Sequence, residues 1–118
     1  MTFTEERNGE VLILGPSGRI DTENSTMLLG KITQVIDGGV RNLLLDFSSV
    51  TYVTSAGLRT LILAAKRLAN LGGKLVLAGL NAQVQRIFEI SGLTSILTVH
   101  PTKAEALSSF DSKLHRRQ

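Results

Sequence analysis

The segment from Leu43 to Leu58 joins a buried-type strand, a polar turn and the start of a helix. Leu43, Leu44 and Leu45 make the strand apolar on both faces, which is typical of a parallel sheet covered by helices. An amphipathic helix then begins at Ser55. Backbone N–H groups in the first turn of a helix lack partners and the helix dipole is positive there, so an added negative charge is tolerated. The segment therefore predicts a helix-covered sheet with a place for a phosphate at Ser55.

Strand and helix signals alternate along the whole chain. Asn8-Gly9 is a strong hairpin signal, glycine pairs end two helices, and Thr102 with Glu105 forms a capping box. The predicted strands are 2–7, 10–20, 43–45, 74–78 and 96–99, and the predicted helices are 23–37, 55–71, a segment from Asn81 to Gly92, and a terminal segment after Thr102. The order ββαβαβαβα predicts a single α/β domain, with a mixed central sheet and about four helices packed on it.

Length and charge limit the class of protein. The 118 residues are enough for one domain, which we expect to span 1–112 before a basic tail, 113–118, without fixed structure. Omitting the tail bases Lys113, Arg116 and Arg117 leaves ten bases against ten acids. One Tyr, four Phe and no Trp also give few stacking platforms for nucleic acid. We therefore expect no direct nucleic-acid partner.

Several other classes of protein are disfavoured by what the chain lacks. It has no cysteine, no apolar signal core in residues 1–7, and no apolar run near the roughly 18 residues of a membrane span. The histidines, His100 and His115, are remote in sequence from Ser55, which also lacks the Gly-x-Ser-x-Gly elbow of a hydrolase. We expect a cytoplasmic protein that does not insert into membranes, with no catalytic residues, metal or cofactor.

The helix predicted over 55–71 has two faces. At about 100° per residue, one stripe is apolar and is expected to face the core: Leu58, Leu61, Ile62, Ala65, Leu68 and Ala69. The opposite stripe contains Ser55, Arg59, Leu63, Lys66 and Asn70. Leu63, framed by two bases, is either an ordinary exposed leucine or part of a partner-binding face. Its alignment with Ser55 keeps both interpretations open.

Three segments together resemble the STAS domain, which is shared by sulphate transporters and anti-sigma factor antagonists. They are Asp46 to Arg59, Gly72 to Ala78 and Phe88 to Leu93. With the turn from Gly18 to Asp21, the resemblance covers essentially the whole chain. In the bacterial anti-sigma factor antagonist branch, a serine at the start of this helix is phosphorylated, and Ser55 is the matching residue.

The resemblance implies a partner-switching cycle. The unphosphorylated protein binds an anti-sigma factor that is also a serine kinase with the histidine-kinase-like ATPase fold, and the sigma factor is released. Phosphorylation ends this binding, and a metal-dependent serine phosphatase resets the protein. The alternative is a stand-alone STAS subunit that regulates a membrane lipid ABC transporter and needs no kinase chemistry at Ser55. A neighbouring gene for one or the other partner distinguishes the two.

The chain departs from the family pattern beside Ser55. Many members carry Asp before the phosphorylated serine and a second serine after it, where this chain has Thr54 and Ala56. Thr54 is therefore a competing acceptor. Asp21 and Asp46 fit helix-capping and turn roles, and the resemblance implies that they also shape the kinase-facing surface. At Gly57, a side chain would crowd the approach of the backbone to a phosphate or partner. The predicted partner-binding set is Asp21, Asp46, Thr54, Ser55, Ala56, Gly57, Arg59, Leu63 and Lys66.

Overall fold

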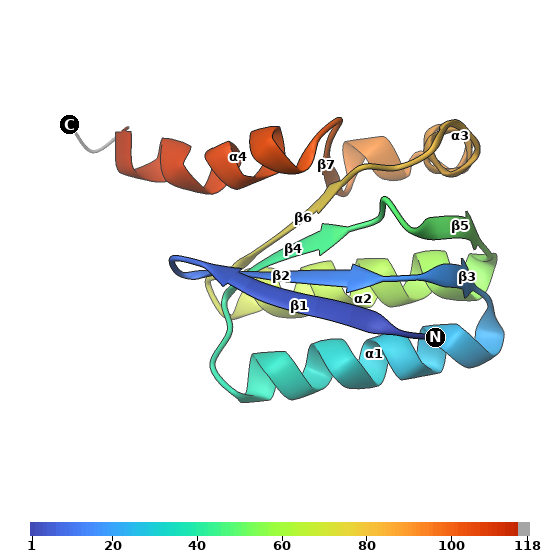
Figure 1. Ribbon diagram of the computed structural model, residues 1–118, viewed down its shortest axis with the longest axis horizontal. Coiled ribbons are helices and arrows are strands. Elements are labelled where there is room, and N and C mark those ends of the chain that lie inside the picture. Colours follow the sequence, from blue (N-terminus) through green and yellow to red (C-terminus); the bar gives the residue numbers. More distant parts are fainter. Residues whose placement is uncertain (116–118) are drawn as a thin grey trace.

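A mixed five-stranded sheet forms the centre of the protein, for which a computed structural model describes the backbone of residues 1–115 and the side chains of residues 1–110 (Figure 1). The strand order is β1-β2-β4-β6-β7. β1 (Phe3–Asn8) and β2 (Val11–Pro16) form an antiparallel hairpin. β4 (Asn42–Asp46), β6 (Lys74–Ala78) and β7 (Thr98–His100) extend the sheet in parallel with β2. The predicted α/β class and the mixed sheet are confirmed.

Helices cover both faces of this sheet (Figure 1). α1 (Thr22–Asp37) and α2 (Ser55–Asn70) pack on one face, into the main core that contains Leu43 and Leu45. α4 (Lys103–His115) packs on the other face, over a smaller core that contains Leu44 and Phe110. Because successive side chains of a strand point to opposite faces, all three leucines of β4 are fully buried. The expectation of a parallel strand covered on both sides is confirmed.

The region predicted as one strand over 10–20 is instead two strands in two sheets. β2 ends at Pro16, and Gly18 then adopts a φ of 90°, a left-handed conformation that favours glycine. β3 (Gly18–Ile20) pairs in parallel with β5 (Val50–Val53), forming a separate two-stranded sheet. β5 was missed because it is short and follows two serines that read as a turn. The order is β1β2β3α1β4β5α2β6α3β7α4, so the predicted order ββαβαβαβα lacked β3 and β5.

The other element boundaries agree with the expected ones within a few residues. A short 3-10 helix, η1 (Leu93–Ser95), follows α3 (Ala82–Ile90), and the last strand then begins at Thr98 rather than at residue 96. The hydroxyl of Thr102 accepts a hydrogen bond from the N–H of Glu105 at 3.1 Å, as the capping box predicts. α4 continues to His115, so the first residues of the predicted tail are helical. The rest of that tail, 116–118, lies outside the described residues.

Two contacts hold the segment between β4 and β5 against α3. Phe47 and Phe88 are both fully buried, and their rings meet edge to face with centroids 6.5 Å apart. The side-chain amide of Asn81 donates to the carbonyl of Val50 at 3.1 Å while its oxygen caps α3. These contacts fix β5, which leads directly into the start of α2.

The described residues contain neither a membrane-spanning helix nor a cluster of metal-ligating side chains. None of the helices is long and apolar enough to cross a membrane. In the same part of the chain, no three His, Cys, Asp or Glu side chains lie close enough together to hold a metal ion.

Candidate functional site

Two neighbouring hydroxyl side chains lie at the junction of β5 and α2, and their environments differ. The backbone N–H and the hydroxyl of Thr54 both donate to the carbonyl of Ile20, each at 3.0 Å. Ser55, the first residue of α2, is exposed, and its hydroxyl makes no hydrogen bond with any residue whose side chain is described. Thr54 therefore holds the helix start on β3, whereas Ser55 presents its hydroxyl to solvent.

The start of α2 also lacks the capping that the neighbouring helices have. Asp21 accepts a hydrogen bond from the N–H of Asn24 at the start of α1, and Asn81 accepts one from the N–H of Val84 at the start of α3. The N-cap of α2, Thr54, makes no such bond, and the first turn contains no acid. The positive end of the helix dipole is therefore not offset by its own side chains.

Gly57 contributes to this junction in a different way from the one expected. It is buried, and a Cβ built on it would lie 2.8 Å from side-chain carbons of Ile20 and Val53 and 2.9 Å from the carbonyl oxygen of Ile20. The close approach is thus between α2 and the β3–β5 sheet. Gly57 is therefore buried against the β3–β5 sheet rather than exposed beside Ser55.

The buried face of α2 is rotated from the predicted one. The buried residues are Gly57, Thr60, Leu61, Ala64 and Leu68. Leu58, Ile62 and Ala65 are only half-buried and Ala69 is exposed. The centre of the buried stripe is therefore rotated by about 90° from the predicted one, at 100° per residue. The buried face differs because Gly57 has no side chain, so that α2 packs directly against β3 at this residue. The predicted outward stripe is exposed as expected, and Leu63 retains 49% of its accessible surface.

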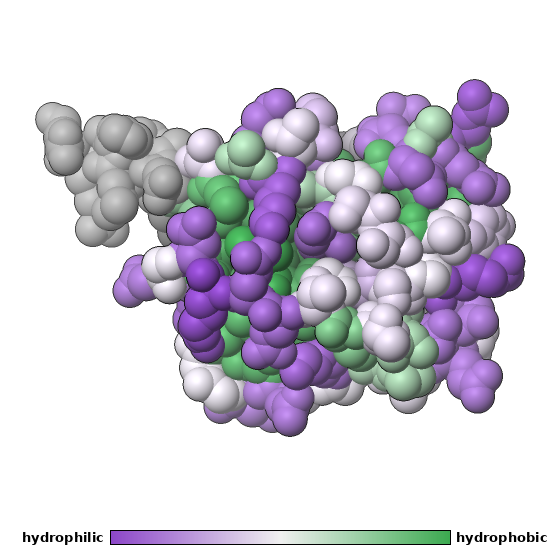
Figure 2. Space-filling model, viewed as in Figure 1, coloured by the Kyte–Doolittle hydropathy of each residue, from purple (hydrophilic) through white to green (hydrophobic). Residues whose placement is uncertain are grey.

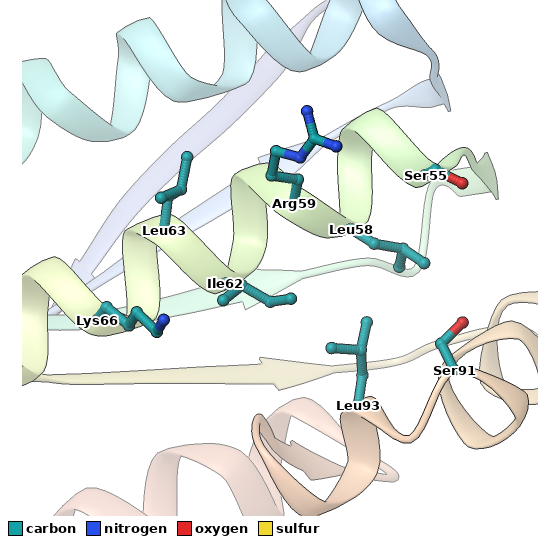
Figure 3. Close-up of a pocket in the computed structure, with 8 residues that line it drawn as sticks. All are labelled: Ser55, Leu58, Arg59, Ile62, Leu63, Lys66, Ser91 and Leu93. Carbon is teal, nitrogen blue, oxygen red and sulfur yellow. The ribbon is translucent and has the colours of Figure 1, made fainter.

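This rotation leaves Leu58 and Ile62 to line a groove of about 390 Å³ between α2 and the segment from Ser91 to Leu93. Figure 3 shows Leu58, Ile62 and Leu93 pointing toward one another, with Ser55 at one end of the groove and Lys66 toward the other. Arg59 and Leu63 also line it. Figure 2 shows one face of the protein, on which apolar side chains gather between polar ones. The groove thus combines an apolar floor with an exposed serine.

The charged groups of the groove are basic. α2 contains three bases and no acid. Arg67 pairs with Asp37 at 2.5 Å. Arg59 and Lys66, by contrast, have no ion pair or hydrogen bond to any side chain in the described range 1–110. Two unpaired cations therefore flank an apolar floor.

The two predicted acids lie outside the groove. Ile20 is in register with Val53, so Asp21 and Thr54, the next residues along, leave the two-stranded sheet together. Asp46 accepts a hydrogen bond from the N–H of Ser48 at 3.1 Å and is in register with Ala78, which belongs to the core under α4. Asp46 therefore lies on the sheet face opposite α2. The structure brings Ser55, Arg59, Leu63 and Lys66 together, but not Asp46.

Sequence reasoning missed the second wall of the groove. Gly92, with a φ of 73°, ends the α3 region as its glycine predicts. Nothing in the local pattern indicates that the residues around it, Ser91 and Leu93, pack beside α2. The only available signal was the resemblance of the segment from Phe88 to Leu93 to a family motif.

Comparisons with known proteins agree with this architecture. The family model described as "STAS domain" matches residues 3–106. BtrV of Bordetella bronchiseptica, provisionally named as an anti-sigma factor antagonist, is 34% identical over 98% of this chain and 100% of its own length. The anti-sigma-B factor antagonist of Listeria monocytogenes is 31% identical over 86% of this chain and 89% of its own.

A solved structure gives the same fold at lower identity. The Bacillus cell fate determinant SpoIIAA, in its phosphorylated form, superposes with a TM-score of 0.69. The match covers 92% of this chain and 99% of SpoIIAA, at 20% identity. At that identity the likeness establishes a shared fold only.

The packing of Gly57 gives a testable prediction. Gly57→Ala should lower the free energy of unfolding by about 1–3 kcal/mol, because the added methyl overpacks the contact with Ile20 and Val53. Gly30→Ala is the matched control: Gly30 is also helical, but a Cβ there meets nothing within 4 Å, so alanine should stabilise by about 0.5–1 kcal/mol. Urea denaturation of both variants measures the difference. Equal stabilisation by both would contradict a close contact between α2 and β3.

Proposed function

Because the chain belongs to the STAS domain family, we propose that it is a cytoplasmic anti-sigma factor antagonist whose partner binding is switched by phosphorylation of Ser55. In this proposal the unphosphorylated chain binds an anti-sigma factor that is a serine kinase of the histidine-kinase-like ATPase fold. The sigma factor held by that kinase is then released, and a metal-dependent serine phosphatase reverses the modification. The observation that carries the proposal is the free, exposed hydroxyl of Ser55 at the uncapped start of α2.

The hydrogen bonds at the junction favour Ser55 over Thr54 as the acceptor. In the reaction, the Ser55 oxygen bonds to the γ-phosphorus of ATP, ADP leaves and the hydroxyl proton is lost. Within the described residues, the Ser55 oxygen makes no hydrogen bond that phosphorylation would have to break. The Thr54 hydroxyl instead donates to Ile20 at 3.0 Å, so its modification would detach the helix start from β3.

A phosphate at Ser55 would act on binding without unfolding the domain. It adds a charge of about −1.5 to −2 and three acceptor oxygens. The uncapped helix start favours negative charge, so the fold should accept it. An interface formed around a neutral hydroxyl would have to desolvate the new charge, which weakens binding.

The groove beside Ser55 is the proposed contact surface. Leu58, Ile62 and Leu63 offer apolar area. Arg59 and Lys66 offer positive charge that is unpaired within the described residues. A partner segment that carries both apolar and acidic side chains complements this combination. Thr54, Ala56 and Asp21 lie at the same junction and remain in the proposed surface. Asp46 and Gly57 are excluded from it, because one faces α4 and the other is buried.

The phosphorylation site can be tested directly. Incubation with the cognate anti-sigma factor kinase and ATP should add one phosphate to Ser55, as located by tandem mass spectrometry. Ser55→Ala should abolish the incorporation, because the acceptor oxygen is gone. Thr54→Ala is the matched control and should still be modified. A phosphate found on Thr54, or no incorporation at all, would refute the assignment.

The contact surface gives a second test. Leu63→Ala and Arg59→Glu should each weaken kinase binding by about fivefold or more, measured by titration calorimetry. Their melting temperatures should stay close to wild type, because exposed substitutions usually change stability by less than about 0.5 kcal/mol. Met27→Ala is the control, since Met27 is as exposed as Leu63, at 47%, but lies on α1 outside the groove. Unchanged affinity in both groove variants would exclude this surface.

A further inference from the structure

Arg59 lies one helical turn after Ser55, and both residues line the same groove (Figure 3). Side chains four residues apart on a helix have Cβ atoms about 5–6 Å apart. Long helical side chains also lean toward the N-terminal end of their helix. The guanidinium group of Arg59 can therefore reach the space outside the Ser55 oxygen.

Within the described residues, no acid forms an ion pair with that guanidinium group. Arg59 is exposed and forms no ion pair or hydrogen bond within the part of the chain whose side chains are described. Neither α2 nor the lining of the groove contains an acid. Asp21, the acid at the same junction, accepts a hydrogen bond from the N–H of Asn24 and forms no ion pair with Arg59. A phosphate on Ser55 would therefore meet an unpaired guanidinium group.

We propose that Arg59 binds the phosphate of phosphorylated Ser55, so that the modification creates its own anion-binding contact within the chain. This inference rests on the proposed function, which supplies the phosphate. The planar guanidinium fork matches two phosphate oxygens and forms charge-assisted hydrogen bonds with them. Lys66, the other unpaired cation of the groove, follows Ser55 by about 16 Å along the helix axis and cannot make this contact.

The contact changes the groove in a second way. Phosphorylation places negative charge at the Ser55 end of the groove, and it also draws Arg59 toward the phosphate. Arg59 is then no longer available to a carboxylate of the partner. One modification therefore removes an attractive cation while it adds an anion, which strengthens the switch beyond the effect of the phosphate charge alone.

The test uses the full chain with phosphoserine installed at position 55 during translation, so that it needs no kinase. The second ionisation of the phosphate is followed by ³¹P NMR in the wild-type chain, Arg59→Gln and Lys66→Gln. A bound guanidinium favours the dianion and lowers the second pKa of the phosphate. Arg59→Gln should therefore raise that pKa, and the proton dissociation constant should fall about threefold. Lys66→Gln, which removes the same charge from the same groove, should leave it unchanged.

Two results would overturn the contact. One is an equal phosphate pKa in wild type and Arg59→Gln, which would mean that the guanidinium does not bind. The other is an equal rise in both glutamine variants, which would indicate a general effect of charge. Because the phosphoserine is introduced genetically, a kinase that fails to modify Ser55 refutes the proposed function but leaves this measurement valid.

Discussion

The attachment of the first turn of α2 to strand β3 determines where the proposed regulatory hydroxyl lies. Thr54 binds the Ile20 carbonyl through both its N–H and its hydroxyl, and Gly57 packs directly against Ile20 and Val53. Thr54 and Gly57 are both engaged in this contact, whereas Ser55, between them in the sequence, is exposed. The same contact rotates α2 so that Leu58 and Ile62 line a groove.

Stability and recognition are divided between opposite sides of α2. The inward side, with Leu61 and Leu68 fully buried, belongs to the main core. The outward side has one half-exposed leucine, a helix start with no capping side chain, and two bases that are unpaired within the described residues. In the proposed switch, the charge added at Ser55 is therefore expected to leave the core undisturbed. With the proposed contact, phosphorylation changes the charge of the groove and also makes the Arg59 side chain unavailable to a partner.

Local patterns predicted the elements, but not how they pack. Periodicity and turn chemistry are local properties. They therefore predicted the buried strand Leu43 to Leu45, the Asn8-Gly9 hairpin and the outward stripe of α2. The β3–β5 sheet could not be predicted in this way, since its short strands are stabilised by each other across a wide sequence separation. The rotation of α2 depends on one glycine meeting Ile20, and the groove depends on Leu93 arriving from another element. These are tertiary contacts, and hydrophobic periodicity does not encode them.

The central claim is that negative charge at Ser55 blocks binding and leaves the fold intact. It is tested by measuring thermal melting and kinase affinity for wild type, Ser55→Ala and Ser55→Asp under identical salt. Helix starts favour negative charge by roughly 0.3–1 kcal/mol, so Ser55→Asp should melt at or slightly above the wild-type temperature and yet lose binding. Ser55→Ala should retain both the wild-type melting temperature and the wild-type kinase affinity. A markedly lowered melting temperature for Ser55→Asp, together with lost binding, would show that charge disorders the helix start and would contradict the account.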